Sequence, residues 1–218
     1  IGNYKIIDHE FDVVVVGAGH AGVEAALAAF RLKKSVLVIT TNIDRIGFMS
    51  CNPSIGGLGK GHIVREIDIL GGAMGYVADQ TCIQFKRLNA KKGPAVRGSR
   101  AQCDKDLYSS KVGEILKSKM QVVEGEVKKL LILNNRVQGV VLGDGSEISA
   151  GSVVLTTGTF MNAVMHVGFE QTQGGRVGDQ ASIGLSDQLK SLGFSVERLK
   201  TGTPARLDKN TIDWSLTI

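Results

Sequence analysis

Proline, cysteine, aromatic residues and long hydrophobic runs are all scarce in this sequence. Its 218 residues include 3 prolines, 3 cysteines and 5% aromatic residues. No apolar run approaches the roughly 20 residues that cross a bilayer, and residues 13–16, the first apolar stretch, follow acidic residues rather than a basic leader. The cysteines form no CxxC motif, so neither a zinc site nor a redox pair is indicated. We therefore expect a cytoplasmic protein with reduced cysteines, no metal and no membrane segment.

Glycine, in contrast, is abundant, with 28 residues against a typical share of roughly 7%. No Gly-X-Y period exists, and a composition of 43% hydrophobic and 22% charged residues excludes low-complexity disorder. The glycines therefore belong to a packed domain, where the backbone bends sharply or approaches another group closely. The net charge of +5 is a mild bias that does not by itself imply a nucleic-acid partner.

A phosphate-binding turn is predicted near the N-terminus. Residues 11–16 have the pattern of a buried strand, residues 20–32 that of a helix and residues 35–39 that of a second strand. Between the first strand and the helix, a GxGxxG motif predicts dinucleotide binding. One glycine permits the turn, the next admits a pyrophosphate, and the last lets helix and strand pack closely. The candidate cofactor-binding residues here are Gly17, Ala18, Gly19, His20, Ala21 and Gly22.

The second strand ends at Thr40 and Thr41, where this fold usually places an acid for the adenosine ribose. The hydroxyl of Thr40 is the candidate replacement, although it bonds a ribose more weakly than a carboxylate does. Short strands at residues 122–123, 127–133 and 137–142 predict a β-meander, and a strand over residues 152–157 follows it. By fold analogy, this return to the nucleotide sheet favours FAD over NAD. The predicted class is α/β, a Rossmann-like FAD-binding domain of the glutathione-reductase type with a small β-meander and inserted loops.

The remaining segments give weaker patterns. Residues 42–61 are expected to form a long ordered loop, and residues 62–75 a helix that ends in a Gly-Gly turn. Residues 84–106 carry seven basic residues and are interrupted by glycine and proline, which predicts a partly looped segment. This segment is either a solvated face or an anion-binding surface. Helices are also expected over residues 104–118 and 181–193, and no closing element over residues 198–218.

The segment from Gly47 to His62 holds a second cluster of glycines around Cys51 and Lys60. Four glycines within six residues suit a backbone wrapped around a planar or anionic group, and the segment is not a Walker loop. Cys51 is the candidate catalytic residue, a reactive thiol beside a flavin; alternatively it is a small residue that fits a tight loop. His20 is expected to orient its turn, and His62 to be a helix-start residue or a proton donor.

These motifs resemble those of the GidA or MnmG family, the FAD-binding subunit of the tRNA wobble-uridine modification enzyme. The resemblance runs through the GxGxxG turn and residues 49–62, then residues 84–102, 155–160, 174–183 and 198–204, which together span nearly the whole chain. It implies that FAD is held by the glycine turn and by the positions of Val127 and Ser182. Gly158, which ends the last strand, is a further candidate cofactor-binding residue. It also implies that residues 1–218 are an FAD-binding domain fragment without the family's second nucleotide region and helical C-terminal domain, and not fully active alone.

The family's reaction uses NADH and methylenetetrahydrofolate to build an aminomethyl-type group on carbon 5 of the wobble uridine. The resemblance therefore implies tRNA as substrate, a GTPase partner subunit, a homodimer in the full-length protein, and a cytoplasmic location, or a mitochondrial one if the source is eukaryotic. Two other functions stay open at this point. One is a general FAD-dependent oxidoreductase acting on a small metabolite, and the other is a non-catalytic RNA-binding module.

Overall fold

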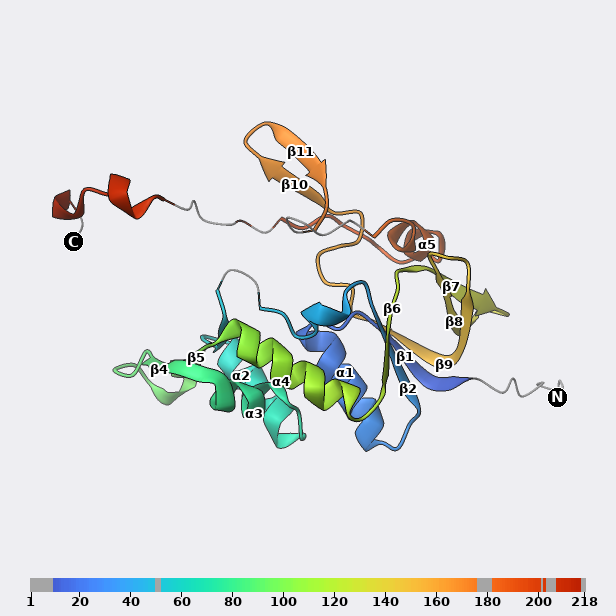
Figure 1. The fold of residues 1–218 in the computed structure, drawn as a ribbon, viewed down its shortest axis with the longest axis horizontal. Coiled ribbons are helices and arrows are strands. Elements are labelled where there is room, and N and C mark those ends of the chain that lie inside the picture. The colour runs from blue at the N-terminus through green and yellow to red at the C-terminus, as the bar shows by residue number, and fades with distance from the viewer. Residues whose placement is uncertain (1–9, 50–51, 176–181, 201, 203–206, 217–218) are drawn as a thin grey trace.

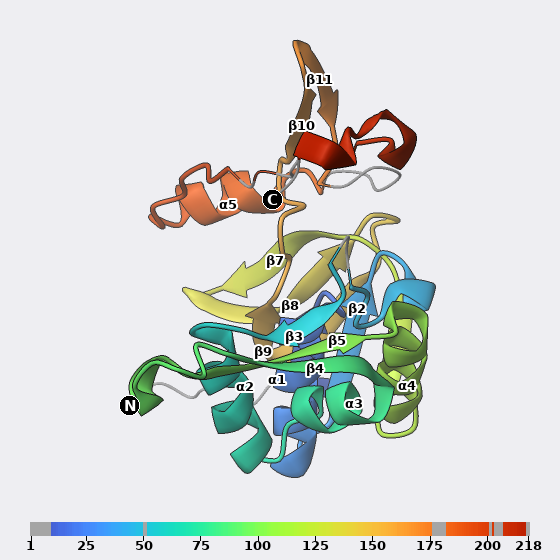
Figure 2. The same cartoon turned by 90° about the vertical axis from the view of Figure 1, so that its left-hand side faces the viewer.

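The computed structural model is built around a six-stranded sheet, and Figures 1 and 2 show how the helices and the smaller elements are arranged about it. The structure describes residues 10–49, 52–175, 182–200, 202 and 207–216. The strand order is β6-β2-β1-β9-β8-β7. The strands are β1 (Phe11–Val16), β2 (Val36–Thr40), β6 (Gln121–Glu124), β7 (Val127–Leu133), β8 (Arg136–Leu142) and β9 (Glu147–Leu155).

The first four strands in this order run parallel, and their β-branched residues alternate between two hydrophobic cores. Val15, Val36 and Val38 face a core built with α1 (His20–Arg31) and α4 (Lys105–Lys117). Val14 and Leu37 face the other side. Because both faces of these strands are covered, β1 and β2 are nearly continuous apolar runs rather than alternating ones.

The second face is covered by the meander of β7, β8 and β9, which pair antiparallel. Val127, Val140 and Ala150 from the meander are buried against Val14 and Ile39 of the parallel strands. The turn between β7 and β8 places Asn134 and Asn135 at φ of 51° and 59°, a conformation that asparagine tolerates better than most residues. The predicted meander is thus confirmed, except that β6 joins the parallel sheet beside β2 instead.

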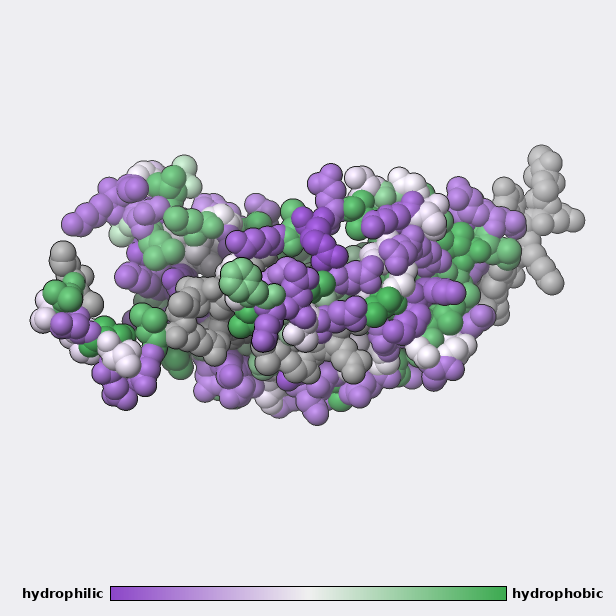
Figure 3. Space-filling model, turned by 90° about the horizontal axis from the view of Figure 1, so that it is seen from above, coloured by the Kyte–Doolittle hydropathy of each residue, from purple (hydrophilic) through white to green (hydrophobic). Residues whose placement is uncertain are grey.

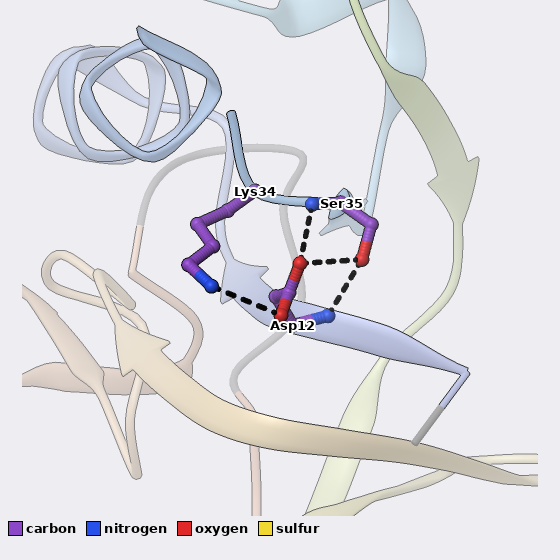
Figure 4. A network of polar contacts seen from close by, with 3 residues as sticks. All are labelled: Asp12, Lys34 and Ser35. Atoms are coloured by element: carbon purple, nitrogen blue, oxygen red, sulfur yellow. Dashed lines mark hydrogen bonds and ion pairs between the residues drawn. The ribbon is translucent and has the colours of Figure 1, made fainter. Parts of the chain in front are cut away.

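A network around Asp12 joins the start of β1 to the loop before β2 (Figure 4). The Asp12 carboxylate accepts hydrogen bonds from the amide of Ser35 at 2.8 Å and from its hydroxyl at 3.0 Å. The Asp12 amide donates to the Ser35 hydroxyl at 2.8 Å, and the Lys34 ammonium lies 3.4 Å from the carboxylate. These bonds hold β1 and β2 in register at the end of the sheet that lies opposite the glycine turn.

Between β2 and β6 the chain builds a second, three-stranded antiparallel sheet in the order β3-β5-β4. Its strands are β3 (Ser54–Gly56), β4 (Cys82–Leu88) and β5 (Gly98–Cys103). Helices α2 (Lys60–Ile69) and α3 (Met74–Thr81) pack against it, and the β4–β5 connection extends away from them in Figure 1. The long loop predicted for residues 42–61 was therefore wrong in part, since it contains β3 and a short 3-10 turn at Ile43–Arg45.

The C-terminal part carries a separate hairpin of β10 (Val164–Val167) and β11 (Glu170–Gln173), then α5 (Leu185–Ser191). After α5 the chain extends away from the sheet (Figure 1), and its described residues form short 3-10 turns at Lys209–Thr211 and Trp214–Leu216. Figure 3 shows a largely hydrophilic upper surface with small separate hydrophobic areas, some of them at this C-terminal end. None of the helices in the described part of the chain is long and apolar enough to cross a membrane.

Candidate functional site

The glycine turn lies where the strand order reverses. From β1 the chain passes through α1 to β2 on one side, whereas β9 pairs with β1 on the other side. In open α/β sheets, ligands bind beyond the carboxyl ends of the strands at such a switch point. The predicted turn from Gly17 to Gly22 therefore sits at the position that this topology favours for a ligand.

Two of the three motif glycines are required by the protein's own backbone. Gly17 has φ of +100°, and a Cβ there would lie 2.5 Å from the carbonyl oxygen of Thr156. A Cβ on Gly22 would lie 1.8 Å from the carbonyl oxygen of Gly17. Both contacts are far inside van der Waals distance, so helix, strand and turn can pack in this way only with glycine at these positions.

Gly19 is different, because within the described structure no atom lies within 4 Å of the position its Cβ would take. Its φ of −71° is available to any residue, so neither strain nor packing demands glycine here. Gly19 also caps the N-terminus of α1, where no side chain of the described residues accepts from the free amides and no acid occupies the first turn. An uncapped helix N-terminus with open space before it suits an anionic group that approaches the backbone closely.

Thr156 stabilises this turn through hydrogen bonds. The sequence did not identify it as a site residue. Its hydroxyl lies 2.8 Å from the Val16 carbonyl and 3.1 Å from the Gly17 carbonyl, and its amide donates to Val16 at 2.9 Å. The bonds join the end of β9 to the end of β1 across about 140 residues of sequence. Only the pairing of the two strands shows this role, because a threonine after a strand carries no distinctive pattern.

Thr40 lies at the end of β2, where it was predicted, and is buried with its hydroxyl 3.4 Å from the carbonyl of Asn42. In the neighbouring strand β6, Glu124 stands opposite Thr40 in register. The Glu124 carboxylate accepts from the amide of Ile43 at 3.0 Å. The acid missing at the end of β2 thus has a counterpart one strand away, which only the three-dimensional pairing reveals.

The other predicted cofactor positions are distributed around the same edge. Val127 is buried at the start of β7. Gly158, at φ of +60°, follows β9. Ser182 lies beside the segment after Gly158, since its amide donates to Phe160 at 2.9 Å and its carbonyl accepts from Asn162 at 2.8 Å. The structure thus brings Ser182 and the end of β9 together.

Titratable groups gather beneath the start of α1. His20 contacts Tyr108 edge to face, with ring centroids 5.7 Å apart. Burial, with a smaller effect of the Lys60 charge, lowers the pKa of His20, which favours the neutral imidazole. Burial likewise raises the pKa of Tyr108 and of the Cys103 thiol. The half-buried His20 ring thus packs against Tyr108 of α4, and its role in orienting the turn stays a prediction.

Lys60, at the start of α2, extends its ammonium to the Ser54 carbonyl at 3.2 Å. Partial burial lowers the pKa of Lys60. His62 lies in the first turn of α2 and is exposed, as expected of a helix-start residue. Cys51, the predicted catalytic residue, lies outside the described residues. No cluster of three metal-ligating side chains occurs among the residues that the structure describes.

The second glycine cluster has an explanation within the protein. A Cβ on Gly56 would lie 2.1 Å from the Ser99 carbonyl, and one on Gly61 would lie 3.1 Å from it. Gly57 and Gly59 have φ of +112° and +73°. Close packing on β5 accounts for Gly56 and Gly61, and left-handed backbone accounts for glycine at positions 57 and 59. No described atom lies within 4 Å of a Cβ at Gly57 or Gly59, so a ligand beside this segment stays a prediction.

A cleft of about 380 Å³ lies on the far side of the 42–48 segment, against α4. Phe48 projects there, with Arg45 at 5.4 Å and Lys105 at 5.7 Å from its ring centroid. The residues lining the cleft are Asn42, Asp44, Arg45, Phe48, Asp106, Ser109 and Ser110. None of them belongs to the glycine turn, so the open space at Gly19 is separate from this cleft.

Together, the switch point, the tight turn and the uncapped helix define an α/β domain of the Rossmann class. The chain belongs to the family described as glucose inhibited division protein A, whose model matches residues 12–218. The resemblance inferred from the motifs is thereby confirmed.

Several relatives are closely similar. The tRNA uridine 5-carboxymethylaminomethyl modification enzyme MnmG of Bdellovibrio bacteriovorus is 64% identical over 96% of this chain and 33% of its own length. The protein of the same name from Geobacter sulfurreducens is 55% identical over 97% of the chain and 34% of its own length. The chain thus spans about a third of the length of these relatives.

Solved structures agree with the fold. Aquifex aeolicus GidA, in its form I crystal, has a TM-score of 0.88 and 50% identity, covering 95% of this chain and 35% of that one. The GidA-related protein from Thermus thermophilus has a TM-score of 0.61 at 21% identity, a likeness that concerns the fold alone. The predicted α/β class is therefore confirmed, and its sheet contains both parallel and antiparallel pairs.

Proposed function

We propose that this chain is the FAD-binding part of a flavin-dependent enzyme that modifies tRNA uridines. The observation that carries the proposal is the open, uncapped start of α1 at Gly19, placed at the switch point of the sheet. Its backbone amides would bind the pyrophosphate of FAD, because free N–H groups and the positive end of the helix dipole both favour an anion. Bound FAD would supply hydride transfer, which no side chain can perform.

The residues present fit such a cofactor along its length. Gly19 leaves room for the pyrophosphate, and Thr156 holds the turn in the required shape. Thr40 and Glu124, side by side at the ends of β2 and β6, offer a hydroxyl and a carboxylate for the ribose. Ser182 and Gly158 lie beyond β9 and suit the remainder of the cofactor.

The further parts of the proposal rest on family membership. The relatives' name specifies 5-carboxymethylaminomethyl modification of tRNA uridine. For a longer protein containing this chain we propose tRNA as substrate, NADH and methylenetetrahydrofolate as co-substrates, a GTPase partner, a homodimer and a cytoplasmic location. The reactive role of Cys51 stays a prediction. NADH oxidation that requires folate and tRNA would distinguish this function from a general flavin oxidoreductase.

FAD binding by the 218-residue chain tests the cofactor assignment. The purified protein should show the visible absorption of oxidised flavin, and FAD at about 100 times its Kd should stabilise the fold by about 2.7 kcal/mol. Gly19→Ala should weaken FAD binding by roughly tenfold or more, about 1.4 kcal/mol, because the new methyl group occupies the space of the pyrophosphate. Without FAD, this variant should lose at most about 1 kcal/mol, the loss of glycine at an N-cap.

The matched control is Gly113→Ala in α4, where a Cβ meets only Ile46 at 4.0 Å. This control should bind FAD like the parent chain. A colourless protein that gains no stability from FAD would contradict the assignment and favour a non-catalytic module. Equal FAD affinity of the parent and of Gly19→Ala would show that the pyrophosphate lies elsewhere.

A further inference from the structure

The β4–β5 hairpin displays an exposed aromatic ring between basic residues. Phe85 is 61% exposed although its register partner Ala101 is buried. Two residues further along β4, on the same face, Arg87 is exposed and stands opposite Ser99. Ile83 on the same edge strand is also exposed, at 69%, so the hairpin presents apolar surface that the described core does not cover.

A second arginine reaches the same face from α2. The Arg65 guanidinium donates to the hydroxyl of Ser99 at 3.3 Å. Arg65 and Arg87 therefore both neighbour Ser99, two positions along the strand from the Phe85–Ala101 pair and on the same face. Glu66 follows Arg65 on α2, but successive helix residues point about 100° apart, which directs Glu66 away from this face.

The residues of the hairpin carry positive charge only. Residues 82–103 contain no acidic residue. Within the described part of the chain, none of the hairpin's six cations forms an ion pair with a carboxylate. On the opposite face Lys86 and Arg100 stand directly across from each other, an arrangement of like charges that destabilises a sheet. A polyanion bound here would relieve that repulsion.

We propose that Phe85, Arg87 and Arg65 form a platform for the unpaired loop of an RNA. The Phe85 ring stacks on one splayed base, and the two arginines bind the flanking phosphates. Aromatic side chains bind single-stranded nucleic acid by stacking on its bases, which a duplex keeps within its own helix. The inference rests on the proposed function, since a tRNA-modifying enzyme must hold its target uridine outside a base pair.

The test compares two labelled RNAs by fluorescence anisotropy, using the FAD-saturated 218-residue chain. One RNA is a hairpin with seven unpaired loop nucleotides, and the other is a fully paired duplex of the same length. Phe85→Ala should weaken hairpin binding roughly tenfold, the loss of one base stack, and change duplex binding less than about twofold. Phe85→Tyr should restore hairpin binding. Arg65→Ala and Arg87→Ala should each lower the slope of log affinity against log salt by about 0.7.

Phe169→Ala is the matched control, because Phe169 is fully exposed between β10 and β11, away from the hairpin. It should bind both RNAs like the parent chain. The inference is wrong if Phe85→Ala leaves binding of the RNA hairpin unchanged or weakens binding of the RNA hairpin and the duplex equally. It is also wrong if an acidic polypeptide binds to the chain as tightly as the RNA hairpin does. Failure of the proposed function would instead appear as absence of FAD binding, which none of these variants should affect.

Discussion

Gly19 and Gly22 of the phosphate-binding turn differ in whether the protein leaves room for a side chain. At Gly22 a methyl group would meet the Gly17 carbonyl at 1.8 Å, whereas at Gly19 the same group meets no described atom within 4 Å. Substitution at Gly22 therefore disturbs the fold itself, since both helix and strand backbone must move. Substitution at Gly19 should leave the fold intact and alter only what approaches from outside, which makes it the informative position for cofactor binding.

Asp12 should make the stability of the domain depend on pH. Hydrogen bonds from the Ser35 backbone and side chain, with a smaller contribution from Lys34, lower the pKa of Asp12 below its usual 3.8. A carboxyl group with a lowered pKa stabilises the folded state above the unfolded pKa, and this stabilisation is lost as pH falls through the folded pKa. Asp12→Asn should thus be less stable than the parent at pH 7 and nearly equal to it in strong acid.

Urea unfolding at a series of pH values between 2 and 7 would measure this difference. Lys34→Ala serves as the comparison, because the lysine contributes only an exposed contact at 3.4 Å and such pairs add little stability. A stability difference between Asp12→Asn and the parent that does not vary with pH would contradict the assignment.

At the scale of elements, one glutamine fixes α5 against the edge of the sheet. The Gln188 side chain accepts from the Leu130 amide at 2.7 Å and donates to the Leu130 carbonyl at 2.9 Å. The Gln188 amide thus bonds β7 as the backbone of another strand would. It satisfies backbone groups at the edge of the sheet, where another protein chain could otherwise pair with β7. The short helix is therefore held by a backbone-like contact as well as by Leu185, which is fully buried.

Gln188→Ala should destabilise the protein by about 1–2 kcal/mol, since it leaves both backbone groups of Leu130 without their partner. Hydrogen exchange of the Leu130 amide should become faster, and thermal unfolding should report the loss of stability. Asp187→Asn, at the exposed neighbouring position, should change neither measurement. Unaltered exchange at Leu130 in Gln188→Ala would show that α5 is held by other contacts.

Elements with a strong local pattern could be predicted from the sequence. The apolar run at 11–16, the glycine turn and the alanine-rich helix follow from neighbouring residues, and β1, α1 and β2 appear within one or two positions of their expected bounds. In contrast β4 was missed, because basic side chains interrupt its alternation, and its strand character depends on pairing with β5. Helix α3 and the β10–β11 hairpin were likewise not predicted.

In the candidate site, too, residues close together in the sequence could be predicted, and residues brought together by strand pairing could not. The three motif glycines could be recognised because their spacing is local, whereas Thr156 and Glu124 reach the site only through strand pairing. At Gly56 and Gly61 the nearest atoms belong to Ser99 of β5, and a sequence does not show that this strand passes beside them. Residue type alone cannot distinguish a glycine that admits a ligand from one that admits another strand.

Across the whole molecule, compact packing ends after α5. Large apolar side chains are exposed there, including Leu199 at 91%, Leu207 at 71% and Leu216 at 80%. Lys200 and Lys209 lie in this segment, which forms neither strand nor α-helix in its described residues. Proteases require accessible backbone free of sheet pairing, and segments with little burial supply it.

Limited trypsin digestion should therefore cleave after Lys200 and Lys209 well before Lys128 and Lys129, which lie within β7. Mass spectrometry of a digestion time course would identify the order of cleavage. A longer protein of this family should resist cleavage at the first two sites, because additional chain would cover their apolar neighbours. Equally fast cleavage within β7 would contradict the compact packing of the sheet.

The pairing of β1 with β9 also has a consequence for synthesis on the ribosome. The turn at Gly17 emerges early, but the Thr156 bonds that complete it require a strand made about 140 residues later. At roughly 5–20 residues per second, that interval lasts on the order of ten seconds. During this time one edge of the apolar strand β1 has no partner, so the nascent chain needs protection from aggregation until its ninth strand leaves the exit tunnel.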